Sequence, residues 1–333
     1  MRTLHSHRTL RRDALGVTLI ELMVAVAIGG FLMIGAVTVF VQSRSTFRVN
    51  QTVSRLQENA RFALATIEPD IRMASYYGLI NLGTFITGHA RTTQPNGIGP
   101  ATCGNNWAID LENPVAGTNN AYAWACAAAA GGARAGSDTI VIRRTADNPT
   151  NAALLVNQTL YVQSSRGRSG TLFVNPPAPA ATGGAQNFIL LSRGYYVCNR
   201  SASLGTKGNT IPSLHRKFLK GNPLGINDEE ILAGVEDMQI EFGVDTDVAG
   251  QANRGSIDRY VNPNDPVLLN ADTVVLAVRV WLRLRAEDIE NEFRDTTNYV
   301  YADVNYTPAA AEQPFRRLLV SKTIYLRNTR PPS

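Results

Sequence analysis

The residue types on which most catalytic and metal sites depend are scarce in this sequence. Among 333 residues there are three cysteines and four histidines, and only 18% of the residues are charged. No HExxH, GxSxG or P-loop spacing occurs, so the sequence lacks the motifs that metalloproteases, α/β-hydrolases and P-loop NTPases need for their chemistry. Residues 97–99 (GIG) do not complete a dinucleotide-binding pattern, because the third glycine is missing. We expect a protein that is not an enzyme, with no catalytic residues, and expect His89 and His215 to be surface or packing residues.

The cysteines contain no CxxC pair, which argues against a zinc knuckle. If the region is exported, one disulfide can form. Cys103 with Cys126 is the first choice, because these two flank one irregular segment and leave Cys198 single. The sequence cannot choose between the three single pairings.

The net charge gives little support for a polyanionic partner. The whole chain has 32 basic and 27 acidic residues, but residues 1–16 contain four arginines and one aspartate. Without them the balance is 28 to 26, a net charge of +2. Nucleic-acid binding therefore loses its main compositional support.

One stretch is apolar enough to cross a membrane. Residues 17–41 contain a single charge, Glu21, and at about 1.5 Å per residue they can span a hydrocarbon core of about 30 Å. The arginine-rich residues 1–16 should stay cytoplasmic, which places the chain after residue 41 on the other face. A carboxylate in a lipid-facing helix costs about 2.5 kcal/mol or more, so Glu21 needs a partner. A freed amino group on Val17, in the same chain or a neighbouring one, would supply it.

Residues 16–25 (GVTLIELMVA) closely resemble the class III signal of type IV pilins and pseudopilins. The likeness combines a short basic leader, a glycine, the TLIE sequence and an apolar helix that runs on. It implies that a prepilin peptidase cleaves after Gly16 and methylates Val17, where the family usually has phenylalanine. It also implies that Glu21 is the assembly carboxylate, which helps to dock the subunit into a fibre.

Downstream of the span, apolar residues recur every three or four positions over residues 53–74, which predicts an amphipathic helix to about residue 77. Pro69 should kink or restart it near residues 65–68. Within this helix, residues 56–64 and 70–74 resemble PilW-type minor pilins. So do residues 234–239, 278–285 and 316–328, so the resemblance touches both ends of the chain.

The rest of the chain predicts a β-rich head. Residues 79–136 read as a long irregular excursion over its surface, and strands are expected at 139–144, 154–163, 171–174, 188–191, 236–244, 274–285 and 318–326. The expected architecture is α+β and pilin-like, a long N-terminal helix packed on an antiparallel sheet. Its parts are a cleaved leader (1–16), the membrane and assembly helix (17–41), the amphipathic helix (42–78) and the periplasmic head (79–333).

Two side-chain groups in the head could bind ligands. Strict alternation over 274–285 puts arginines opposite the apolar face, and the basic set could meet nucleic acid: Arg279, Arg283, Arg285, Arg316, Arg317, Arg327 and Arg330. Neighbouring acids favour a solvated strand face instead. Asp245, Asp247 and Asp258 crowd oxygens around a turn and weakly indicate calcium, but EF-hand spacing is not met and an ordinary hairpin turn is favoured. No other cofactor is expected.

The PilW resemblance implies a non-enzymatic minor pilin that helps to start assembly of a type IV pilus and sits at its tip. It implies an inner-membrane precursor that later joins the fibre at the cell surface. The implied partners are prepilin peptidase, other minor pilins, the major pilin, the inner-membrane assembly platform and a tip adhesin. Twitching motility, adhesion or DNA uptake would be the outputs. Two alternatives stay open, a J-type pseudopilin of type II secretion and a single-pass anchored periplasmic receptor or binding protein.

Overall fold

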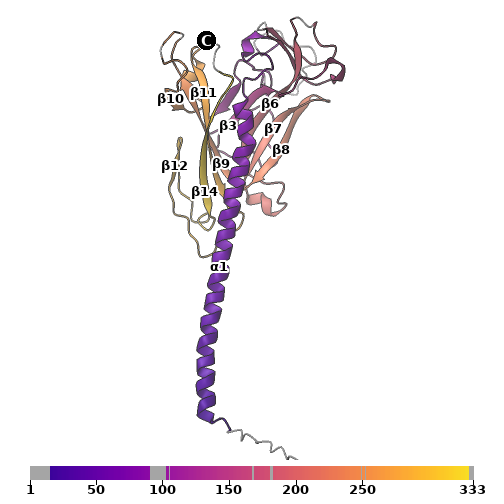
Figure 1. The fold of residues 1–333 in the computed structure, drawn as a ribbon. Coiled ribbons are helices and arrows are strands. Elements are labelled where there is room, and N and C mark those ends of the chain that lie inside the picture. Colours follow the sequence, from indigo (N-terminus) through magenta and orange to yellow (C-terminus); the bar gives the residue numbers. More distant parts are fainter. Residues whose placement is uncertain are drawn as a thin grey trace, which may run out of the picture. The chain divides into compact units, whose positions relative to one another are not determined.

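The computed structural model describes residues 16–90, 103–104, 106–166, 169–180, 183–248, 250–251 and 253–329 (Figure 1). It consists of a long helix and a β-rich head, which confirms the predicted α+β, pilin-like architecture. The chain divides into two compact units, Met1–Val53 and Ser54–Ser333.

The helix α1 (Leu19–Arg72) runs without a break through both units. Among the described residues it is the one helix long and apolar enough to cross a membrane, and its most apolar stretch is wholly exposed in the single chain. Its large apolar side chains from Leu19 to Val41 are more than half exposed. Because so much apolar surface is stable only in lipid or against other helices, this part of α1 fits a membrane anchor.

The later part of α1 belongs to the head and is amphipathic as predicted. Five residues at steps of three and four are buried: Leu56, Ala60, Ala63, Ile67 and Ile71. The helix ends at Arg72, earlier than the predicted residue 77, and Ser75 then takes a left-handed φ of 65°. The predicted restart near residues 65–68 is wrong. Pro69 sits in the last turn, where losing one hydrogen bond is tolerated, and its carbonyl still accepts from the amide of Met73 at 3.1 Å.

Two sheets and a hairpin form the head. The larger sheet has the order β1-β5-β4-β6-β3-β2, with β7 and β8 continuing from β6, and every pairing is antiparallel except β1 with β5. The smaller sheet has the order β10-β9-β11-β14, and β12 pairs with β13. The strands of the larger sheet are β1 (Ile86–Thr87), β2 (Val115–Thr118), β3 (Thr139–Thr145), β4 (Tyr161–Ser165), β5 (Ser169–Phe173), β6 (Gln186–Cys198), β7 (Ser213–Lys220) and β8 (Gly225–Ala233). The others are β9 (Val235–Asp245), β10 (Arg259–Val261), β11 (Val274–Arg285), β12 (Tyr299–Tyr301), β13 (Val304–Tyr306) and β14 (Arg317–Tyr325). Short 3-10 turns are η1 (Gly83–Phe85), η2 (Ala152–Leu154), η3 (Lys207–Thr210) and η4 (Pro266–Leu269).

The main hydrophobic core joins α1 to both sheets. From Ser54 on, α1 runs between the strands of the two sheets, and its buried face packs with Ile140 and Tyr195 of the larger sheet and Ile240 and Val280 of the smaller one (Figure 1). Burying each such side chain contributes about 1.5–3 kcal/mol, so the helix helps to hold the two sheets together.

A second core covers the other face of the larger sheet. Val141, Val162 and Leu190 point away from α1 and are covered by residues of the irregular segment, including Trp107 and Leu111. The sequence predicted that residues 79–136 cross the head surface. The structure corrects this, because part of the segment is buried and it also contains β1 and β2. In this segment the sulfurs of Cys103 and Cys126 lie 2.00 Å apart in a disulfide, and Cys198 is a buried free thiol.

The sequence predicts the bounds of the strongly alternating strands well and those of the polar strands poorly. β3, β9, β11 and β14 lie within one residue of the expected bounds. The expected strand at 154–163 begins only at Tyr161, because Leu154 closes a 3-10 turn, and β6 continues to Cys198, well past the expected 191. Strands β7 and β8 were missed, since β7 buries polar residues rather than an apolar alternation.

Candidate functional site

The predicted processing and assembly residues lie at the start of α1. Gly16 and Val17 precede the helix, and Val17 is 73% exposed. The Thr18 amide and hydroxyl donate to Glu21 Oε2 at 3.0 and 2.9 Å, and the Glu21 amide donates back to Thr18 Oγ1 at 3.3 Å. This is a capping box, which satisfies amides that have no partner within the helix.

The capping box was missed, although Thr18-x-x-Glu21 before an apolar run is its sequence signal. It means that Glu21 has a structural role inside the single chain as well as the assembly role predicted for it. The roles of Gly16, Val17 and Glu21 in processing and assembly stay predictions.

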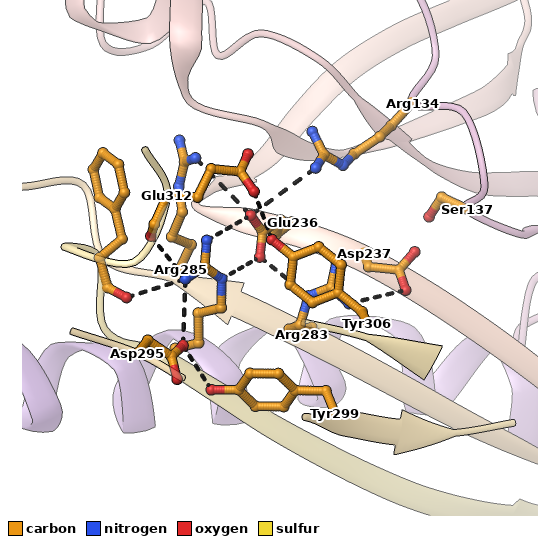
Figure 2. Close-up of polar contacts among 12 residues, drawn as sticks. Arg134, Ser137, Glu236, Asp237, Arg283, Arg285, Asp295, Tyr299, Tyr306 and Glu312 are labelled. Atoms are coloured by element: carbon orange, nitrogen blue, oxygen red, sulfur yellow. Dashed lines mark hydrogen bonds and ion pairs between the residues drawn. The ribbon is translucent and has the colours of Figure 1, made fainter. Parts of the chain in front are cut away.

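A cluster of charged side chains lies on the smaller sheet, and all of its members except the partly exposed Arg134 have buried side chains (Figure 2). We call it the buried charge cluster: Arg134, Glu236, Asp237, Arg283, Arg285, Asp295 and Arg317. A bulge creates it, since the β9–β11 register shifts so that Arg283 is opposite Asp237 while Leu284 is opposite Val235. Glu236 is the extra residue. The bulge lets Val235 and Met238 both join the apolar core, while the two acids between them face the arginines.

Glu236 is the centre of the buried charge cluster. Its carboxylate accepts from Arg317 Nε at 2.8 Å and from Arg283 Nε at 3.1 Å, while Arg134 and Arg285 lie 3.9 Å away. The side chains of Glu236 and Arg317 are both 0% exposed. Burial alone would raise the pKa of Glu236, but the hydrogen bond and charge of Arg317, with the charges of Arg283 and Arg285, hold it below its ordinary value.

Two tyrosines of β12, the first strand of the β12–β13 hairpin, contact acids of the buried charge cluster. Tyr301 donates to Asp237 Oδ2 at 2.5 Å, and Tyr299 donates to Asp295 Oδ2 at 2.9 Å. Asp295 also lies 3.3 Å from Arg317 Nη1. Burial, with the hydrogen bond to Asp295 added, raises the pKa of Tyr299 to about 12. These contacts fasten the segment between β11 and β14 over the sheet.

This arrangement corrects the predicted solvated arginine face. The side chains of Arg283, Arg285 and Arg317 are buried and face acids, so they do not form a basic surface for nucleic acid. Of the other members of that set, Arg279 pairs with Glu241 at 3.1 Å and Arg316 with Glu290 at 2.8 Å. Arg330 lies outside the described residues.

The three predicted calcium ligands do come together. One carboxylate oxygen from each of Asp245, Asp247 and Asp258 lies within 4.8 Å of the others. Two of the carboxylates already hold the turn: Asp245 accepts from the Asp247 amide at 2.9 Å, and Asp258 accepts from the Thr246 amide at 2.7 Å. Partial burial, then the charges of Asp258 and Asp245, raise the pKa of Asp247. Calcium binding stays a prediction, and the absence of heat on calcium titration of the purified chain would contradict it.

Ser213, His215 and Asp228 lie in the order of a catalytic triad. His215 Nε2 is 3.1 Å from Ser213 Oγ, and His215 Nδ1 is 3.0 Å from Asp228 Oδ1. The Ser213 hydroxyl is buried and donates to the carbonyl of Arg200 at 2.6 Å, so it is not available as a nucleophile. The group therefore joins β7 to β8, consistent with a packing role for His215. His89 is also buried, 3.7 Å from Glu112.

We expect Asp228→Asn to destabilise the head by about 2 kcal/mol at pH 7. Burial alone would raise the pKa of Asp228, but hydrogen bonds from His215, Lys217 and Tyr196 lower it to about 2. A lowered pKa stabilises the fold above the unfolded value near 3.8, and that contribution disappears as the pH falls through about 2. Urea unfolding of both chains in detergent at pH 7 and pH 2.5 measures the difference, which should shrink at the lower pH.

The control is Asp288→Asn, because Asp288 is 73% exposed in its ion pair with Lys207 and should contribute little. An Asp228→Asn effect that is the same at both pH values would contradict the electrostatic explanation.

Comparison with protein families gives two matches. The prokaryotic N-terminal methylation motif matches residues 11–37, and type IV pilus-assembly protein W (PilW) matches residues 194–328. Searches of curated proteins and of solved structures gave no significant match. The first match, with the long apolar helix and the β-rich head, defines a type IV pilin-like protein. Within that class residues 194–328 are similar to PilW, which agrees with the predicted resemblance to PilW-type minor pilins, and the matched part contains Glu236, Arg283 and Arg317 of the buried charge cluster.

Proposed function

We propose that this chain helps to start the assembly of a type IV pilus and sits at the fibre tip. The observation that carries the proposal is the joining of a methylation-motif helix to a PilW-type head in one chain. The head is large, since 255 residues follow Gly78. A head of this size would strain regular repeated packing along a fibre, while its helix can still join the bundle at one end.

The precursor would sit in the inner membrane with residues 1–16 in the cytoplasm and the head in the periplasm. Prepilin peptidase would cut after Gly16 and methylate Val17. The chain would then contact other minor pilins, the major pilin, the inner-membrane assembly platform and a tip adhesin through its helix and head. Its role would be structural rather than enzymatic, with twitching motility, adhesion or DNA uptake as the output.

Mass spectrometry of the chain purified from its native membrane tests the processing step. We expect the wild-type chain to begin at methylated Val17. The Gly16→Leu chain should not be cut and should still begin at Met1. The matched control is Gly29→Leu, which should still be cut, because nothing lies within 4 Å of the Cβ position at Gly29. A wild-type chain beginning at Met1 would contradict the pilin proposal and favour an anchored receptor.

Deleting the gene tests the assembly step. We expect fewer filaments, and expect the chain itself in sheared filaments. If filaments are unchanged in number and lack the chain while protein secretion fails, the J-type pseudopilin alternative holds instead.

A further inference from the structure

The head contains a cleft of about 420 Å³ beyond the end of α1. It is lined by Ser75, just after the helix, by residues of the irregular segment up to β2, and by the residues between β10 and the start of β11. A volume of this size is typical of ligand sites.

The backbone beside the cleft belongs to an open sheet edge. Among the described strands, β2 is the last on its side of the larger sheet and pairs only with β3, and β10 ends the smaller sheet. Alternate residues of an antiparallel edge strand direct their N–H and C=O groups away from the sheet. Among the described residues no further backbone hydrogen bond engages Val115–Thr118, and three of these four residues line the cleft.

The cleft walls combine apolar surface with acid. Phe242, Leu268 and Val275 line it, and Leu269 at its rim is 90% exposed. The only charged side chains among the described lining residues are Asp110 and Glu112. A group that fits must therefore carry apolar side chains, and a positive charge rather than a negative one.

Asp110 offers an acceptor that the described residues leave unused. Its Oδ2 accepts from Asn113 Nδ2 at 2.9 Å, while its Oδ1 is buried with no hydrogen-bond partner among the described residues. The same holds for Oγ1 of Thr273, another residue of the cleft lining. The nearby buried cation is Arg143, whose Nε donates to the Trp107 carbonyl at 2.7 Å. Arg143 Nη1 donates to the Asn113 carbonyl, so the charge of Arg143 acts on Asp110 but, among the described residues, no hydrogen bond reaches Asp110 Oδ1.

We propose that this cleft binds an extended peptide segment of a partner protein. The segment would pair with the open edge of β2, place a lysine or arginine against Asp110 and pack an apolar side chain on Leu269. This proposal does not depend on the proposed role of the chain in pilus assembly. Peptide binding is measured on the purified chain, so it can fail or succeed whether or not the chain starts pilus assembly.

Phage-displayed random octapeptides, selected on the mature full chain in detergent micelles, test the proposal. We expect enrichment of peptides that combine a basic residue with apolar neighbours. Synthetic copies of the enriched peptides should bind Asp110→Asn and Leu269→Ser about tenfold more weakly than the wild-type chain. Leu269→Ser leaves folding intact because Leu269 is exposed, and Glu292→Gln, an exposed acid outside the cleft, is the matched control with unchanged affinity.

Three outcomes would overturn the proposal. One is a selection that enriches no peptide, and another is equal binding of the enriched peptides by all the variants. The third is concentration-dependent self-association that Leu269→Ser abolishes, which would make the cleft a contact between copies of this chain.

Discussion

Replacing Glu236 by glutamine should lower the free energy of unfolding of the head by about 3–5 kcal/mol, because it breaks buried ion pairs from one side. Glu236 accepts from both Arg283 and Arg317, and the side chain of Arg317 is as fully buried as that of Glu236. The glutamine keeps the shape but removes the charge that holds four arginines together. Three of them, Arg283, Arg285 and Arg317, have buried side chains and would then be short of an acid (Figure 2).

Urea unfolding of the full chain in detergent, followed by tryptophan fluorescence, measures this loss. The reporter is close, since Trp281 lies in β11 with its ring 6.0 Å from that of Tyr301. The pKa of Glu236 is lowered, so its contribution is present at neutral pH and is lost only when acid protonates the carboxyl group. Glu292→Gln, an exposed acid, should change the free energy by no more than about 0.5 kcal/mol.

A double-mutant cycle separates an ion pair from a packing effect. We expect the double variant Glu236→Gln with Arg317→Met to lose less stability than the sum of the two single variants. Each single change leaves the charge of the other residue unpaired, and the double change removes both charges. Strictly additive losses would mean that the two residues do not act together, and would contradict the buried charge cluster as a cooperative unit.

Strand β11, which carries Arg283, shows how much of the fold could be predicted from the sequence. Alternation over β11 correctly separated Val278, Val280 and Leu282 from the arginines, because a strand's side chains point to opposite faces. Alternation does not say what covers the second face. The cover comes from the segment between β11 and β14, whose short strands β12 and β13 have no lasting period. The burial of Arg283 and Arg317 could therefore not be predicted.

Whether the other structural features could be predicted depends on whether neighbouring residues in the sequence specify them. The capping box at Thr18 and Glu21 is spelled out in four consecutive residues and was predictable. β7 was not, because its buried residues Ser213, His215 and Lys217 are polar and satisfied by partners such as Asp228 on β8. The cleft brings together Asp110 and Leu269, which are far apart in the chain, so no local pattern marks it.

Replacing Glu21 by glutamine should leave cleavage intact but lower incorporation of the chain into filaments at least about tenfold, which corresponds to about 1.4 kcal/mol. A carboxylate among apolar side chains is stable only with a partner, and the proposed partner in a bundle is the methylated amino group of Val17 on the same or a neighbouring helix. Glutamine removes the charge. The readout is the amount of this chain in sheared filaments relative to its amount in membranes.

The capping box makes this variant decisive. Glutamine can accept from the Thr18 amide and hydroxyl as glutamate does, so Glu21→Gln keeps the cap and loses only the charge. Thr18→Val does the reverse, since it removes the hydroxyl and keeps the carboxylate. If the charge drives assembly, Glu21→Gln and Glu21→Ala should fail equally while Thr18→Val assembles. If Glu21→Gln assembles normally and Thr18→Val fails, the carboxylate serves only to begin the helix, and its proposed pairing with a neighbouring amino group is wrong.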